Sequence, residues 1–246
     1  MYIRIVIQRI KLMPTILSFD CANQTLGIVL ISYDFANIRK LNKFLSSYTP
    51  SESTILDVLK MANKAANGVT LHKAWLFKLI TEGRVRDTPE IERIALLKNV
   101  MKQVRAESEC VDYVVIEHQM GDLEKSVYSA IVYEFCNPKS GAQIVLQMGQ
   151  IQPTPPMIEH KTCNIINIHP TYKNSFYFHE SLNYSNYLDK YKTLKGANKA
   201  HTTENFLYYL QVFQPELLVQ TKKSEINHLA DAFMQAYYAI HNLIPN

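Results

Sequence analysis

The segment Asp112-Tyr-Val-Val-Ile-Glu117 decides the fold class of this chain. Its four consecutive apolar residues predict a strand that is buried on both faces, like a central strand of a parallel sheet. The strand ends in a carboxylate, Glu117. Because functional sites of open α/β sheets form at the carboxyl ends of central strands, Glu117 is the first candidate functional residue.

Two apolar runs upstream of this segment predict an antiparallel pair of strands. Thr15-Ile-Leu-Ser-Phe-Asp20 and Gly27-Ile-Val-Leu-Ile-Ser-Tyr33 contain many β-branched residues and are separated by a short polar turn. Asp20 ends the first run, as Glu117 ends the later one. Further strands are expected at 38–44, which is more basic, at 69–79, and at 165–170, where Pro170 ends the strand.

Apolar residues three and four positions apart predict helices between these strands. The segment 51–67 begins with Ser51 and is followed by Gly68, residues typical of a helix start and a helix end. A lysine-rich stretch at 190–199 leads into a helix that continues to Tyr209. The remaining helices are expected at 91–104, 123–135 and 225–240. This succession of strands and helices predicts an α/β protein.

Composition restricts the class of protein. Of 246 residues, 47% are apolar and 20% are charged, which excludes a disordered, collagen-like or coiled-coil chain. The net charge of +4 permits a polyanionic partner. With only 7 glycines, the chain lacks both G-x-x-x-x-G-K-[ST] and G-x-G-x-x-G, the usual phosphate-binding motifs. The 4 cysteines form no C-x-x-C pair, which favours reduced thiols over a zinc or redox site.

The start of the chain predicts neither a signal peptide nor a membrane span, because charged residues interrupt its apolar run. A soluble, intracellular protein is therefore expected. Met13, just before Pro14, is a second candidate start. We interpret 13–246 as a single domain and 1–12 as an N-terminal extension, with insertions near 46–68 and 137–163.

Three acids stand where an ionised carboxylate is costly. Asp20 and Glu117 end apolar strands, and Asp231 lies among apolar residues of the last helix. His228 precedes Asp231 by one helical turn, so the two side chains face the same way. Carboxylates that converge need a counter-charge, and this set indicates a divalent metal site. Taken singly, each residue also has an ordinary interpretation: a turn or cap, a polar loop, a hydrogen-bonded helix histidine or an ion pair.

Together, these residues resemble the motifs of a known family. Ile16-Leu-Ser-Phe-Asp-Cys-Ala22, Val114-Val-Ile-Glu-His-Gln119 and His228-Leu-Ala-Asp-Ala232 are similar to the active-site motifs of RuvC-like Holliday junction resolvases, in particular the poxviral and fungal mitochondrial branches. The resemblance spans about residues 15 to 240 and implies a ribonuclease H-like fold with a central five-stranded mixed sheet flanked by helices. The chain departs from the family at Ala22, where glycine is usual, and at Asn227-His228, where the poxviral pattern has an acidic pair.

The resemblance implies a structure-selective DNA endonuclease that resolves four-way junctions by paired symmetric nicks. Its catalytic and metal-binding residues would be Asp20, Glu117, His228 and Asp231. Two Mg²⁺ ions about 4 Å apart, for which Mn²⁺ can substitute, would lie between them. The products would carry 5′-phosphate and 3′-hydroxyl ends, and no organic cofactor is needed. A homodimer is expected because a four-way junction has two-fold symmetry, and the helices at 91–104 and 123–135 are candidates for its interface.

Several basic residues are candidates to bind the DNA backbone. Phosphate contacts position DNA without reading its bases, and lysines of the resembling segments supply the charge. Met120 and Tyr128 follow the Glu117 motif, where relatives place a group that stacks at the junction centre, although packing is their more ordinary role. The candidate DNA-binding lysines are Lys173, Lys195, Lys199, Lys222 and Lys223, for each of which simple solvation is the alternative.

Three other functions are consistent with parts of the sequence. A ribonuclease H-like nuclease would use the same metal chemistry on an RNA–DNA hybrid or structured RNA. An actin-like kinase or ATPase would use the segment Asp20–Gly27 as a phosphate loop, but a second Gly-rich Asp loop is missing from the sequence. A non-catalytic DNA-binding scaffold would not need all four candidate ligands. The many Ile, Asn, Lys and Tyr residues are typical of an AT-rich genome, such as that of a large DNA virus, which would place the protein at the site of viral genome replication.

Overall fold

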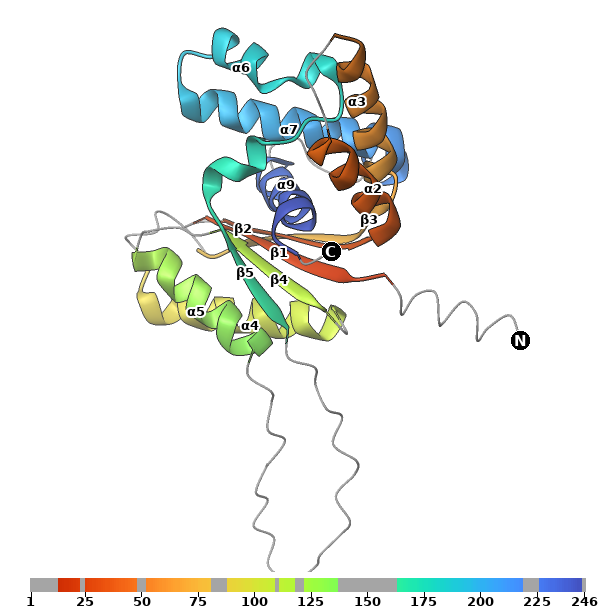
Figure 1. Ribbon diagram of the computed structural model, residues 1–246. Coiled ribbons are helices and arrows are strands. Elements are labelled where there is room, and N and C mark those ends of the chain that lie inside the picture. Colours follow the sequence, from red (N-terminus) through yellow and green to blue (C-terminus); the bar gives the residue numbers. More distant parts are fainter. Residues whose placement is uncertain are drawn as a thin grey trace, which may run out of the picture.

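A five-stranded mixed sheet forms the centre of the computed structural model, which describes residues 13–22, 25–47, 52–80, 88–108, 111–117, 122–136, 163–218 and 226–244. The strand order is β3-β2-β1-β4-β5, and helices cover both faces (Figure 1). β1 pairs with β2 and β2 with β3 in antiparallel directions, whereas β4 runs parallel to β1 and β5 parallel to β4. The strands are β1 (Thr15–Cys21), β2 (Thr25–Tyr33), β3 (Val69–Lys78), β4 (Tyr113–Glu117) and β5 (Asn164–Ile168). This arrangement confirms the predicted α/β class and the central five-stranded mixed sheet flanked by helices.

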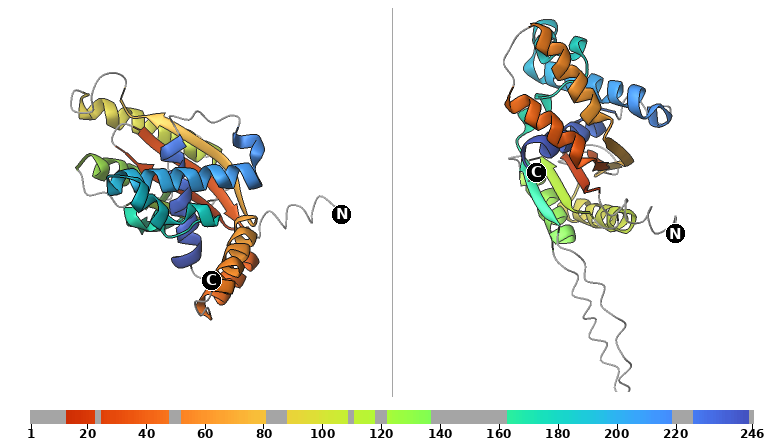
Figure 2. Two further views of the ribbon diagram at one scale, coloured as in Figure 1. Left: turned by 90° about the horizontal axis from the view of Figure 1, so that it is seen from above. Right: turned by 45° about the vertical axis from the view of Figure 1, so that its right-hand side comes forward.

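The sheet separates two clusters of buried hydrophobic residues. Figure 2 shows the sheet and the helices around it from two further directions. Leu17 and Phe19 of β1 pack against α4 (Glu90–Glu107) and α5 (Asp122–Cys136). Ile16 belongs to the other layer, together with α7 (Leu194–Phe213) and α9 (Ile226–Asn242). Because side chains alternate along a strand, Asp20 shares the face of Ile16 and points toward α9. The alternation along β1 therefore predicts that the Asp20 carboxylate lies on the α9 side of the sheet.

The prediction of a third strand at 38–44 was wrong. This segment is part of α2 (Phe35–Ser46), which packs on α3 (Glu52–Ala66). Ile38 and Leu41 are buried three residues apart, while the basic residues between and after them are exposed. The Oδ1 atom of Asp34 accepts a hydrogen bond from the backbone N–H of Ala36 at 2.9 Å and so caps the start of the helix. The apolar residues Ile38, Leu41 and Phe44 are three positions apart, which is helical spacing and not the alternation of a strand.

The other predicted helices are confirmed, with adjusted ends. The lysine-rich stretch is divided between two helices, and α7 begins at Leu194, where the Thr193 hydroxyl accepts a hydrogen bond from the N–H of Gly196 at 3.1 Å. In α4 the apolar face is only partly covered, because Ile91 and Ile94 are 79% and 47% exposed. The short elements are η2 (Pro170–Asn174), η3 (Glu180–Leu182), α6 (Tyr184–Lys190) and α8 (Pro215–Leu218).

Two predicted regions lie mainly or wholly outside the described residues: the N-terminal extension at 1–12 and the insertion near 137–163. The division into one domain with these additions stays a prediction. Among the helices that the structure describes, none combines the length and the apolar character needed to span a membrane.

Candidate functional site

Four of the predicted site residues meet on the α9 face of the sheet. Asp20 and Glu117 lie at the carboxyl ends of neighbouring parallel strands, β1 and β4. Helix α9 crosses the same face, contacts both β1 and β2, and carries His228 and Asp231. The three acids are 3%, 6% and 6% exposed in chain order. The structure thus brings together Asp20, Glu117, His228 and Asp231, as their joint prediction requires.

Lys173 lies inside this group of acids. Its Nζ is 2.9 Å from Oδ2 of Asp231 and 3.6 Å from Oε2 of Glu117, and the residue is only 9% exposed. Lys173 belongs to η2, the short turn that follows β5, so the end of a third strand also contributes to the site. From the sequence, Lys173 is a candidate to bind phosphate. In the structure its ammonium group forms ion pairs with Asp231 and Glu117.

His228 contacts the acid on β1. Its Nδ1 lies 2.7 Å from Oδ2 of Asp20, a distance that fits a hydrogen bond donated by the imidazole. A hydrogen bond from Nδ1 fixes the ring and leaves Nε2 as the nitrogen that faces a ligand. His228 is therefore held by Asp20 rather than being an isolated helix histidine.

Two polar residues that the sequence analysis missed complete the site. The hydroxyl of Thr202, on α7, donates a hydrogen bond to Oδ1 of Asp231 at 2.8 Å. The side-chain amide of Gln235 donates a hydrogen bond to Oε2 of Glu117, and Gln235 is fully buried. Gln235 follows Asp231 by four residues and so lies on the helix face that also carries His228 and Asp231. That spacing was available in the sequence, whereas Thr202 carried no comparable signal.

The negative charge of the site exceeds its positive charge. Burial raises the pKa of Glu117 to about 8, against the opposing charge of Lys173 and with added repulsion from Asp20. Burial also raises the pKa of Asp231 above its usual range. For Lys173, burial alone would lower the pKa, but the charges of Asp231, Glu117 and Asp20 raise it above the ordinary value, so this lysine stays protonated. Without another cation, the site therefore retains a proton on its carboxylates at neutral pH.

The donor set fits a hard divalent cation. Carboxylate oxygens from Asp20, Glu117 and Asp231, with an imidazole nitrogen, are ligands that Mg²⁺ or Mn²⁺ accepts. Across the described part of the chain, no three His, Cys, Asp or Glu side chains already stand at the spacing of a metal shell. The Nζ atom of Lys173 supplies the positive charge that pairs with Glu117 and Asp231. A divalent ion would thus bind these carboxylates only after an ion pair of Lys173 with Asp231 or Glu117 is broken.

The remaining candidates for DNA contact lie in different surroundings. Lys195 and Lys199 are exposed on the first turns of α7, the helix that also carries Thr202. The Tyr128 hydroxyl accepts a hydrogen bond from Asn167 at 3.2 Å and its ring packs on the α4–α5 layer, which favours the packing role. Lys222, Lys223 and Met120 lie outside the described residues.

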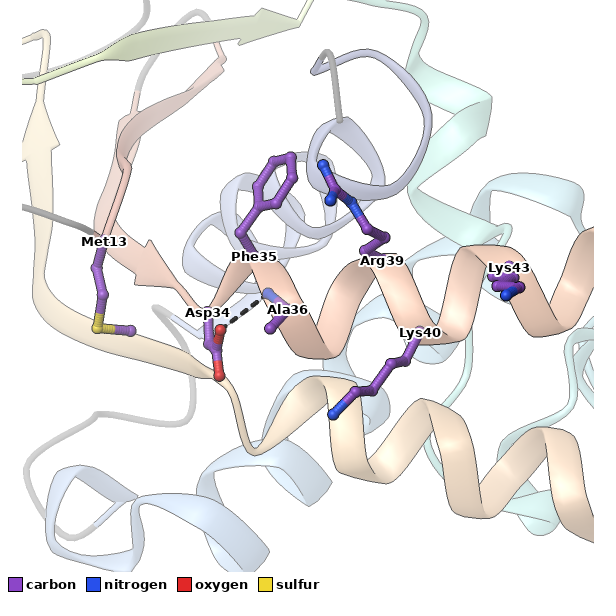
Figure 3. A pocket seen from close by; sticks show the side chains of 7 residues that line it. All are labelled: Met13, Asp34, Phe35, Ala36, Arg39, Lys40 and Lys43. Atoms are coloured by element: carbon purple, nitrogen blue, oxygen red, sulfur yellow. Dashed lines mark hydrogen bonds between the residues drawn. The ribbon is translucent and has the colours of Figure 1, made fainter.

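A pocket of about 660 Å³ lies at the other end of the sheet (Figure 3). It is bounded by Met13, before β1, and by Asp34, after β2, whereas Asp20 lies at the opposite end of β1. Arg39 stacks over the ring of Phe35 there, with 5.0 Å between Cζ and the ring centroid. This pocket is basic and open, and it contains none of the predicted catalytic residues. Its lining residues are Met13, Asp34, Phe35, Ala36, Arg39, Lys40 and Lys43.

Comparisons with known proteins find similarity only among solved structures. No family model matches the chain, and no curated protein matches its sequence. The resolvase of fowlpox virus, solved with substrate Holliday junction DNA, is 11% identical with a TM-score of 0.48, covering 94% of this chain and 99% of that one. RuvC of Thermus thermophilus is 11% identical with a TM-score of 0.44, covering 93% of this chain and 97% of that one. At such identities the similarity concerns the fold alone.

Proposed function

We propose that this protein is a divalent-metal-dependent endonuclease that resolves four-way DNA junctions. The observation that carries this proposal is the meeting of three buried carboxylates, from β1, β4 and α9, of which two pair with Lys173 and the third contacts His228. Structural ion pairs rarely need three buried acids for one cation, because each unpaired charge costs several kcal/mol. Such an excess of acids is useful where a divalent ion binds. The sequence motifs around these acids, which resemble those of junction resolvases, direct the proposal toward branched DNA.

The chain's own residues have distinct roles in this proposal. Asp20, Glu117, Asp231 and Nε2 of His228 would hold two Mg²⁺ or Mn²⁺ ions, which activate a water and stabilise the leaving 3′ oxygen when bound. Gln235 and Thr202 orient the carboxylates of Glu117 and Asp231 through their hydrogen bonds. Lys173 is protonated and would contact the phosphate that enters beside the acids. The products would carry 5′-phosphate and 3′-hydroxyl ends.

Exposed lysines on α7 would bind the DNA arms. Lys195 and Lys199 lie on the helix that supplies Thr202 to the site, so phosphates bound there would be close to the acids. Such contacts make affinity fall with added salt. Lys222 and Lys223 precede α9 in the chain and are proposed to act in the same way.

We also propose that two copies act together. A junction needs two symmetric nicks, which a two-fold homodimer can supply. The α4–α5 layer exposes Ile91, Ile94 and Tyr133, at 79%, 47% and 69%, which supports this layer as the interface. If the AT-rich composition reflects a large DNA virus, the place of action would be where viral genomes replicate. Sedimentation of the metal-free protein at micromolar concentration tests the dimer.

The test of function compares substrates under one condition. A synthetic four-way junction, a linear duplex of the same sequence and an RNA–DNA hybrid are each incubated with the protein in Mg²⁺ or Mn²⁺. Symmetric nicks in the junction, with ligatable ends, are expected, and the linear duplex should stay intact. Preferential cleavage of the hybrid would instead assign the chain to the ribonuclease alternative.

A further inference from the structure

Gly27 lies beside Asp20 at the point where α9 crosses the sheet. The two residues are direct partners in the antiparallel pairing of β1 and β2. Paired residues project their side chains to the same face, so a side chain at position 27 would point toward α9, as that of Asp20 does. Position 27 is therefore part of the contact surface between the sheet and the helix that carries His228 and Asp231.

The helix approaches so closely here that no side chain fits. A Cβ atom on Gly27 would lie 2.5 Å from the carbonyl oxygen of His228, 2.7 Å from its carbonyl carbon and 2.8 Å from its Cβ. Two of these atoms belong to the backbone, so a change of rotamer cannot relieve the contact. Ordinary van der Waals contact between such atoms begins near 3.4 Å. Any larger residue would move α9 outward by about 1 Å.

We propose that Gly27 sets the spacing between α9 and β1. It is thereby a positioning residue for the site formed by Asp20, Glu117, His228 and Asp231, called the acid site below. The inference rests on the proposed nuclease function for its consequence, although its geometry does not depend on that function. At the present spacing, Nδ1 of His228 reaches Oδ2 of Asp20 at 2.7 Å. A shift of about 1 Å would break this hydrogen bond and separate Asp231 from Asp20. Misplacement of catalytic groups by about that distance lowers the rate about 100-fold.

The experiment compares Gly27→Ala with Gly68→Ala. Gly68 is the matched control, because an added Cβ there meets its nearest atoms at 3.2 Å, and these atoms belong to Ala65, Asn37 and Asp34 at the other end of the sheet. In metal-free protein, ¹⁵N NMR of the His228 ring reports its hydrogen bond to Asp20. We expect this signal to shift in Gly27→Ala and to stay unchanged in Gly68→Ala.

Cleavage and binding provide the second readout. In Gly27→Ala, we expect the turnover rate on a four-way junction to fall about 100-fold while the junction Kd in EDTA stays within about threefold of the wild-type value. A merely structural role would not separate these two quantities. A wild-type His228 signal together with wild-type turnover in Gly27→Ala would overturn the inference. If the wild-type protein itself leaves junctions intact, the proposed function fails, but the NMR comparison still decides the role of Gly27.

A second variant covers loss of folding in Gly27→Ala. Ala232 is fully buried on α9 four residues after His228, on the same side of the helix, so Ala232→Val enlarges the side of the helix that carries His228. A shifted His228 signal in a folded Ala232→Val protein supports the spacing role. An unchanged signal and unchanged turnover in this variant contradict it.

Discussion

The two ends of the central sheet differ in how deeply their charged side chains are buried. At the carboxyl ends of β1 and β4, three acids and a lysine are almost completely withdrawn from water. At the other end of β1, the basic side chains of Arg39, Lys40 and Lys43 border an open pocket and remain exposed. An exposed charged side chain costs little free energy of folding and can be substituted with little effect. A buried charged side chain is tolerated only with a partner of opposite charge or hydrogen bonds.

The open pocket and the acid site also differ in the protonation behaviour of their charged groups. The open pocket has a volume of about 660 Å³, yet its charges are solvated and only Asp34 among them has a capping role. The acid site instead contains raised carboxyl pKa values and an excess of negative charge. Burying an ionisable side chain and shifting its pKa costs free energy of folding. Buried side chains with shifted pKa values therefore indicate a functional site more directly than the volume of a cavity does.

The largest expected effect comes from Asp231→Asn. Loss of this carboxylate should lower junction cleavage by at least about 1,000-fold, because the substitution removes a ligand charge while keeping the side-chain shape. Binding of the junction in EDTA should stay near the wild-type value. Asp34→Asn makes the same change at the other end of the sheet and should leave cleavage unaffected. Normal cutting by Asp231→Asn would remove this residue from the site.

A smaller effect is expected from Gln235→Leu. The variant keeps the apolar packing but removes the hydrogen bond that orients Glu117, so cleavage should fall by about 10- to 100-fold. The concentration of Mn²⁺ needed for half-maximal rate should rise. Gln211→Leu, at an exposed position of α7, is the control. Equal metal requirements in both variants would contradict an orienting role for Gln235.

The stability of the metal-free protein should fall as pH rises. Glu117 has an ordinary pKa of 4.5 and a folded-state pKa of about 8, so the folded protein binds more protons between these values. Its contribution is fully present below about pH 4.5 and is lost as pH rises through about 8. Glu117→Gln should remove this slope and unfold with a free energy about 2 kcal/mol higher at pH 8. Urea denaturation in EDTA at pH 5 and pH 8 measures it, and equal slopes in both proteins would contradict the assignment.

The smallest effect is expected at the open pocket. Lys40→Gln and Lys43→Gln remove exposed charges that are far along β1 from the acids, so turnover and Tm should change by no more than about twofold and about 1 °C. Cleavage assays at low and moderate salt provide the measurement. A loss of turnover as large as that in Gln235→Leu would mean that the open end takes part in catalysis.

The sequence predicted most strands and brought together Asp20, Glu117, His228 and Asp231 as candidates, because both follow from local pattern. An apolar run that ends in a carboxylate is visible in one dimension at Asp20 and at Glu117. The i, i+3 spacing of His228 and Asp231 is equally local. These features need no knowledge of how distant segments meet.

The features that the sequence did not predict depend on tertiary contacts. In the sequence, nothing distinguishes Lys173 from other lysines or Thr202 from other helix threonines. Only the fold brings both side chains to Asp231, Lys173 through η2 and Thr202 through the packing of α7 on α9. The segment 38–44 was misassigned because its exposed charges obscured the helical spacing of Ile38 and Leu41. Burial, which decides all three cases, is a property of the assembled chain.

We propose that the buried acids form a metal-dependent nuclease centre for branched DNA. The most direct measurement follows cleavage of a 5′-labelled four-way junction by wild-type protein and by Asp20→Asn, each with Mn²⁺, with Mg²⁺ and with EDTA. Paired nicks by the wild type in either metal, none in EDTA, and none by a junction-binding Asp20→Asn are predicted. Nicking that persists in EDTA or in Asp20→Asn would contradict the account.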